Sequence, residues 1–112
     1  MMQIYSRHLE VTEPLRVYLD EKIGRLYDLR SDIISLRVDL SRDDHHRKGD
    51  VYRVEANLNL PNKFIRVVEI KPDVREAIDL ASDKLLRQVR DYKDRKLSWR
   101  RRVGGWLRKG KR

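Results

Sequence analysis

Four basic residues recur at three-residue steps in the C-terminal third of the chain, a pattern that could hold the phosphate groups of a polyanion. They are Lys84, Arg87, Arg90 and Lys93. On an α-helix a three-residue step drifts by about 60° per repeat, so these side chains would form a slanting basic ridge. Acidic residues at 83, 91 and 94 interrupt the ridge, and a solvated helix face with internal ion pairs would have the same spacing. Both interpretations stay open on spacing alone.

A second pair of basic residues lies one helical turn apart, opposite the apolar stripe of an earlier predicted helix. These residues are Lys22 and Arg25. Beside the basic ridge, such a pair would suit two phosphate strands or the groove of a folded RNA. The pattern therefore favours nucleic-acid binding as the class of function.

Residues 98–112 hold most of the excess positive charge. Seven of the 27 basic residues and none of the 18 acidic ones lie there, so residues 1–97 carry only +2 of the net charge of +9. We interpret this segment as a disordered basic arm whose phosphate contacts would make binding steeply dependent on salt. The candidate contacts in the arm are Arg100, Arg101 and Arg102.

Two other interpretations of the same segment stay open. It could form a short amphipathic membrane anchor on its apolar residues, although Gly104-Gly105 argues against a stable helix. Those apolar residues are Trp99, Val103, Trp106 and Leu107. Alternatively, one of the two tryptophans folds back to cover the end of the sheet.

One short run, Asp43-Asp44-His45-His46, has acid–base or metal-binding potential. We expect it to be a solvated hairpin loop, because a zinc site needs further ligands placed by rigid neighbours. The chain has no cysteine, no Gly-rich phosphate loop and no nucleophile motif. We therefore expect no enzyme activity, no metal, no cofactor and no small-molecule substrate.

The elements that would position these residues follow from the apolar periodicity. A short strand is predicted at 2–7, and a helix begins near Thr12, which can cap its free amides. Alternating apolar residues predict strands at 34–40 and 52–60, and an Ile- and Val-rich run predicts a third at 64–70. Short connections favour antiparallel pairing of these three strands.

The last predicted helix begins near Pro72 and carries an apolar stripe as far as Val89. Beyond Tyr92 the sequence is mostly charged, so we expect the helix to pass the edge of the sheet or to fray. Gly104-Gly105 should break any continuation.

This order predicts an α+β fold, β-α-β-β-β-α, in which a four-stranded sheet has both helices packed on one face and water on the other. The length suits a single domain at 1–97, followed by the basic and flexible tail at 98–112. There is no apolar stretch long enough to span a bilayer and no signal-peptide core, so we expect a cytoplasmic protein.

Four segments of the sequence resemble the ribosome hibernation-promoting factor family, which includes the ribosome-associated inhibitor protein Y. The segments are VTEPLRVYLDEKIGRL, SLRVDLS, YRVEANL and DVREAIDLASDKLLRQV. They occur in the family's order over about 1–96. The most specific piece is Ala77-Ile78-Asp79 followed by 83–88, DKLLRQ.

The resemblance implies a β-α-β-β-β-α fold, similar in outline to double-stranded RNA-binding domains. It also implies a function in ribosome hibernation under stress and in stationary phase. Members bind the small ribosomal subunit and its 16S rRNA in the decoding channel of the 70S ribosome, where they block mRNA and the A- and P-site tRNAs. They use no cofactor and catalyse nothing. The length is similar to that of the short type, expected to be monomeric off the ribosome.

The resemblance also carries over individual basic positions. Lys22 and Arg25 match basic positions of the family's first helix, and Lys84, Arg87 and Lys93 match those of the second. A further basic position falls at residue 91, which is aspartate here, and the neighbouring Arg90 could reach the same phosphates. A general RNA-binding module that acts through its basic helices and tail is the alternative function.

Overall fold

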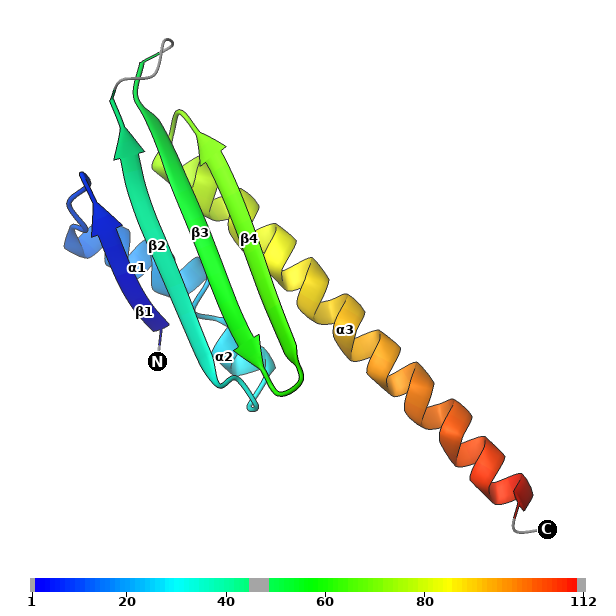
Figure 1. The fold of residues 1–112 in the computed structure, drawn as a ribbon. Helices are drawn as coiled ribbons and strands as arrows, with labels where there is room; N and C mark the ends of the chain where they lie inside the picture. Colours follow the sequence, from blue (N-terminus) through cyan, green and yellow to red (C-terminus); the bar gives the residue numbers. More distant parts are fainter. Residues whose placement is uncertain (1, 45–48, 111–112) are drawn as a thin grey trace.

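The chain forms one four-stranded sheet with its helices on a single face, and the last helix continues well beyond the sheet (Figure 1). The computed structural model describes the backbone of 2–44 and 49–110, and the side chains of 2–44 and 49–92. The molecule is elongated, with principal extents of 67 × 28 × 18 Å. This two-layer arrangement confirms the predicted α+β architecture.

The sheet contains β1 (Met2–Arg7), β2 (Ser35–Asp43), β3 (Val51–Leu60) and β4 (Lys63–Lys71), in that spatial order. The last three pair antiparallel, as predicted. β1 pairs with β2 in the parallel direction, which makes the sheet mixed. The connection between these two strands crosses the face of the sheet through the first helices, as a parallel pair requires.

A capping threonine and a glycine set the two ends of helix α1 (Glu13–Lys22). The Thr12 side chain accepts a 3.4 Å hydrogen bond from the Leu15 amide at its start. At its end, a Cβ on Gly24 would lie 2.7 Å from the Asp20 carbonyl oxygen, so only glycine fits this turn. The predicted helix carried both Lys22 and Arg25, but α1 ends at Lys22, and a one-turn helix α2 (Leu26–Leu29) follows.

Helix α3 (Val74–Gly110) is a single continuous helix that passes the edge of the sheet, as one of our two expectations had it (Figure 1). The helix break expected at Gly104-Gly105 is wrong. Each glycine costs about 1 kcal/mol relative to alanine, but the flanking arginine, leucine and lysine residues favour a helix that has already formed. The backbone is therefore helical across residue 97, and the division into a domain at 1–97 and a basic arm at 98–112 stays a prediction.

The core lies between the sheet and the helices. Alternate residues of β2, β3 and β4 point into it, and the apolar stripes of the helices cover them. The largest fully buried side chains include Leu19, Leu36, Leu58, Ile78 and Leu85. Burying each of these stabilises the fold by roughly 1.5–3 kcal/mol. The opposite face of the sheet is left to solvent, as the alternating sequences predicted.

Candidate nucleic-acid interface

Lys22 lies at the C-terminal end of α1, where α3 holds it in place. Its main-chain carbonyl accepts a 2.7 Å hydrogen bond from the Ser82 hydroxyl. Its ammonium lies 3.8 Å from Asp79 Oδ1 and 5.7 Å from the centre of the Tyr18 ring. The side chain remains partly exposed, so Lys22 presents an oriented positive charge beside the junction of the two helices.

Tyr18 joins the same two helices and collects a second cation. Its hydroxyl donates a short hydrogen bond to Asp79, and this bond, together with burial, raises the pKa of Tyr18 to about 12. The Arg75 guanidinium lies 4.8 Å from the centre of the Tyr18 ring. Tyr18, Lys22, Arg75 and Asp79 thus form a helix-junction cluster with two positive charges and one negative charge.

Sequence reasoning missed Arg75 as a member of the basic surface. The signal was available, because Arg75 precedes Asp79 by four residues and so shares its helix face. Arg75 was missed because it does not belong to the three-residue pattern of the ridge. It is also not one of the basic positions that the family resemblance carried over. Its exposure and its place beside Lys22 make it a further candidate for phosphate contact.

Arg25 is exposed at the N-terminal end of α2. Within the described part of the chain its side chain has no ion-pair partner. Arg30, at the other end of α2, has a different role, since its guanidinium bonds to Asp32 at 2.6 and 2.8 Å and lies over the Tyr92 ring at 5.3 Å. Arg30 therefore fastens α2 to α3 instead of offering a free charge.

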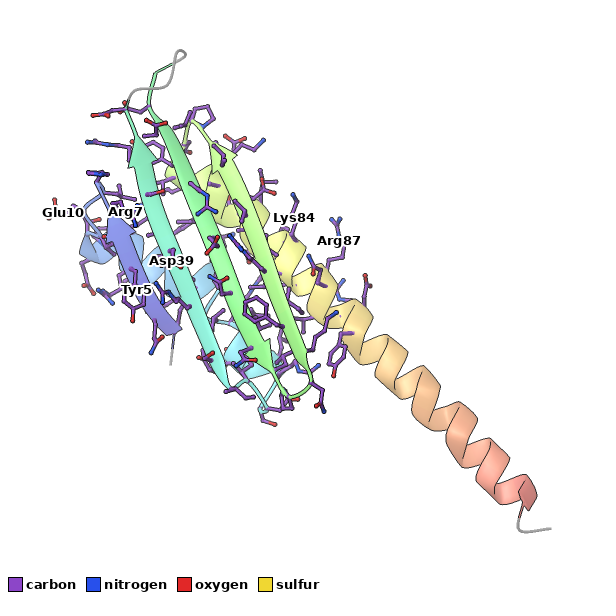
Figure 2. The ribbon with its side chains drawn as sticks, in the orientation of Figure 1. Tyr5, Arg7, Glu10, Asp39, Lys84 and Arg87 are labelled. Atoms are coloured by element: carbon purple, nitrogen blue, oxygen red, sulfur yellow. The ribbon has the colours of Figure 1, made fainter. Side chains whose placement is uncertain are left out.

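The basic ridge on α3 crosses the helix obliquely, as its spacing predicts. Lys84 forms an ion pair with Glu69 of β4, whose side chain is only 11% exposed. Arg90 borders a shallow hollow that Leu29 of α2 also lines, so it lies on the opposite flank. Arg87 lies between them and is exposed, and Figure 2 shows Lys84 and Arg87 projecting outward from α3.

These contacts show that each of the two interpretations of the ridge applies to some of its residues. Lys84 is an ion-paired residue, as expected of a solvated charged face. Arg87 and Arg90 are exposed and have no ion-pair partner among the residues whose side chains are described. Both can therefore offer free guanidinium groups. The side chains of Lys93, Arg100, Arg101 and Arg102 lie outside the described side chains.

The sequence raised two other kinds of site, a metal site at 43–46, where we expect a solvated loop, and a membrane anchor at 98–112 as one alternative. Among the described side chains, those of 2–44 and 49–92, no group of three or more histidine, cysteine or acidic residues could hold a metal ion. His45 and His46 lie outside the described residues. No helix in the described part of the chain combines the length and the apolar character that crossing a bilayer requires.

Residues 2–97 match the family described as Sigma 54 modulation protein / S30EA ribosomal protein. A ribosome hibernation promotion factor of Deinococcus radiodurans is 43% identical over 102 residues, which are 88% of this chain and 53% of that protein. One of Staphylococcus aureus is 31% identical over 93 residues, 83% of this chain and 48% of that protein. The chain thus spans about half the length of these curated relatives.

Two solved structures share the fold. A ribosomal subunit interface protein of Coxiella burnetii matches with a TM-score of 0.71 at 22% identity, over 83% of this chain and 97% of that one. The N-terminal domain of Thermus thermophilus Protein Y matches with a TM-score of 0.66 at 31% identity, over 80% and 94%. These matches confirm the predicted fold and the resemblance. The chain belongs to the Sigma 54 modulation protein / S30EA ribosomal protein family, whose curated members include ribosome hibernation promotion factors.

Proposed function

We propose that this protein is a ribosome hibernation factor that binds the small ribosomal subunit in the decoding channel and blocks mRNA and the A- and P-site tRNAs. The observation that carries the proposal is the basic surface that α1, α2 and α3 form together on a fold shared with ribosome-associated relatives. Its residues are Lys22, Arg25, Arg75, Lys84, Arg87 and Arg90. No cofactor or catalytic step is needed, because the folded body itself occupies the space.

The electrostatics of this surface suit a phosphate backbone. Arg25, Arg87 and Arg90 are exposed and offer guanidinium forks that match phosphate oxygens. Lys22 has a carboxylate partner, but exposed ion pairs are worth only about 0–1 kcal/mol, so exchanging the carboxylate for a phosphate costs little. Each phosphate contact releases counterions, and binding should therefore weaken as salt rises.

The remaining parts of the proposal concern the setting. We place the protein in the cytoplasm, on the 16S rRNA of the 70S ribosome, as a monomer when off the ribosome. The relatives named as hibernation promotion factors support a ribosomal partner. The small subunit is what the resemblance to the hibernation-promoting factor family implies, and the basic helix surface suits its rRNA phosphates.

Sedimentation with ribosomes tests the proposal. The double variant Arg25→Gln/Arg87→Gln should shift protein from the ribosomal to the free fractions and weaken inhibition of translation in vitro. The single variants Arg25→Gln and Arg87→Gln are each compared with Arg16→Gln, which also removes one charge. Arg16 precedes Tyr18 by two residues and so lies about 160° around α1 from the side that faces α3. Equal ribosome binding by the double variant and the control would contradict our assignment of the surface.

A general RNA-binding module is the second candidate, and the charge of residues 98–112 favours it. Deleting 98–112 separates the two functions, since a general binder should lose nearly all RNA affinity. A factor matched to the ribosome by shape should keep much of its affinity for the small subunit. The readout is the affinity of the truncated and full chains for small subunits and for an unrelated folded RNA.

A further inference from the structure

The open face of the sheet, opposite the helices, carries an ordered network of charged side chains that reaches all four strands. The Tyr5 ring of β1 lies 4.1 Å from the Arg37 guanidinium of β2. Arg37 in turn donates to both oxygens of Asp39 at 3.1 and 3.2 Å. Figure 2 shows Tyr5 and Asp39 on these neighbouring strands. The first half of the network therefore fixes a guanidinium against an aromatic ring.

The second half continues across β3 to β4. The Asn57 amide donates to Asp39 at 3.4 Å and to Glu55 at 3.2 Å, linking the two carboxylates. Glu55 also accepts from Arg53 at 2.9 Å and from Arg66 at 3.0 and 2.6 Å. Both carboxylates are thus held by donors from the sheet itself.

The network is layered, with its anions beneath its cations. The side chains of Asp39 and Glu55 are 27% and 14% exposed, whereas those of Arg37, Arg53 and Arg66 are 51%, 40% and 57% exposed. A partner that approaches this face therefore meets guanidinium groups first. The carboxylates below screen the arginines from one another and leave the outer layer positive.

Unused donors remain in that outer layer. A guanidinium has five N–H donors, and Arg37 and Arg66 each use only Nε and Nη2 within the described residues. Arg7, on β1, is exposed and has no ion-pair partner in the described part of the chain. These free donors match the oxygens of phosphate groups.

Two exposed aromatic rings flank the network. Tyr5 on β1 is 48% exposed, and Phe64 on β4 is 59% exposed. Two adjacent hollows lie between them, with volumes of about 480 and 400 Å³, and Arg37, Asp39 and Glu55 line both. Aromatic rings beside a positive groove are the elements with which proteins stack the bases of single-stranded nucleic acid.

We propose that the open sheet face is a second RNA-binding surface that takes unpaired nucleotides. Arg7, Arg37 and Arg66 hold the phosphates, and Tyr5 and Phe64 stack the bases. This surface is separate from the basic helix surface, so the protein can hold RNA on both of its faces. An acidic protein segment would share the charge complementarity, but it would leave the exposed rings and their flanking hollows unexplained.

Binding to a labelled, unstructured oligouridine tests the proposal in the full chain. All further substitutions are made in the helix-surface variant Arg25→Gln/Arg87→Gln. Because its helix surface binds RNA more weakly, a loss of RNA binding at the sheet face can be measured. Added Phe64→Ser should weaken binding at least about fivefold, the loss of one stacked base. Added Arg7→Gln should lower the slope of log affinity against log salt by about 0.7, the value for one single-strand phosphate.

Neither Phe64 nor Arg7 is part of the ion-pair network, so the variants leave its carboxylates paired. Circular dichroism and urea unfolding verify that each variant folds, and added Arg16→Gln is the charge-matched control. As a second probe of the network, Arg66→Lys keeps the charge beside Glu55 and removes the fork, and it should also weaken binding. Oligouridine affinities equal to that of the control overturn the proposal. Polyglutamate is the probe for an acidic protein segment, and variants that lose polyglutamate binding while RNA binding stays intact also overturn the proposal. Ribosome sedimentation reports separately on the helix surface.

Discussion

The Ser82 hydroxyl donates a 2.7 Å hydrogen bond to the main-chain carbonyl of Lys22, so α3 caps the end of α1. The last carbonyl groups of a helix have no partner within that helix, and a side chain from elsewhere can supply one. Here the donor is a buried serine on the helix that also carries the basic ridge. A buried contact therefore fixes the relative placement of Lys22 and the ridge, in addition to the more exposed ion pair between Lys22 and Asp79.

Replacing Ser82 tests this cap. Ser82→Ala should lower the free energy of unfolding by about 1 kcal/mol, the typical worth of one internal hydrogen bond. Urea unfolding measures the loss, and Ser31→Ala, in an exposed bend, is the matched control. An unfolding free energy equal to that of the control would mean that the bond contributes nothing to the junction.

Lys84 should stabilise the fold as well as bind RNA. Lys84→Gln leaves the nearly buried Glu69 carboxylate without its cation, so unfolding should become easier by about 1 kcal/mol. Arg87→Gln, three residues along on the exposed flank, should leave stability unchanged. A double-mutant cycle with Glu69→Gln measures the coupling between the two side chains, and additive effects would contradict the pairing.

A charge reversal at the same position, Lys84→Glu, should disturb the fold as well as RNA binding. It would place two carboxylates together at the junction of α3 and β4 and would lower stability for a reason unrelated to RNA. Loss of ribosome binding in that variant is therefore informative only beside Lys84→Gln. We expect both variants to bind ribosomes less tightly, with the reversal also unfolding at lower urea concentration.

The helix-junction cluster predicts a loss of stability in strong alkali. Tyr18 has its pKa raised from 10.0 to about 12, so between these pH values the folded state binds more protons than the unfolded state. The stabilisation is complete below pH 10 and is lost as the pH rises toward 12. Unfolding measured across this range should become easier in the parent protein, with a shallower dependence in Tyr18→Phe. When tyrosinate formation is followed by ultraviolet absorbance, Tyr18→Phe should lack the ionisation near pH 12.

The sheet network predicts the opposite dependence in acid. Burial alone would raise the pKa of Glu55, but hydrogen bonds from Arg53, Asn57 and Arg66 outweigh it and hold the pKa below the usual 4.5. The stabilisation is therefore present above that value and is lost as the pH falls through the folded-state pKa. Glu55→Gln should unfold with a weaker dependence on acidic pH.

The control for this experiment is Glu10→Gln, which removes an exposed carboxylate that has no ion-pair partner in the described part of the chain. It should keep the acid dependence of the parent protein. If the free energy of unfolding of Glu55→Gln falls in acid as steeply as that of the parent protein, the network does not hold this carboxylate ionised.

The sequence predicted the layers of the fold because alternation and helical periodicity are local signals. Leu36, Val38 and Leu40 alternate with polar residues, and that alone places one face of β2 in the core. The end of α1 was not predicted, since it depends on how closely Gly24 approaches the Asp20 carbonyl. The helix through Gly104-Gly105 was also missed, because cooperative extension outweighs the local propensity of two glycines.

The sequence predicted the candidate site only where the spacing of residues along one helix was sufficient. Spacing on α3 placed Arg87 and Arg90 on neighbouring flanks of the helix. The partners that distinguish a free cation from a paired one come from distant parts of the chain. Glu69 beside Lys84 lies on another element, and Tyr18 and Asp79 are 61 residues apart. Side-chain pairing at such separations follows from packing, which no local pattern contains.

The parallel pairing of β1 sets an order on the folding of this chain. Strands β2, β3 and β4 follow one another antiparallel, so they can pair through contacts close in sequence. β1 reaches β2 only after α1 has crossed the sheet, and as a six-residue edge strand it has one neighbour alone. We therefore expect β1 to be the last strand to join the sheet and the first to detach from it. Its amide protons should exchange with solvent through openings that leave the other three strands closed.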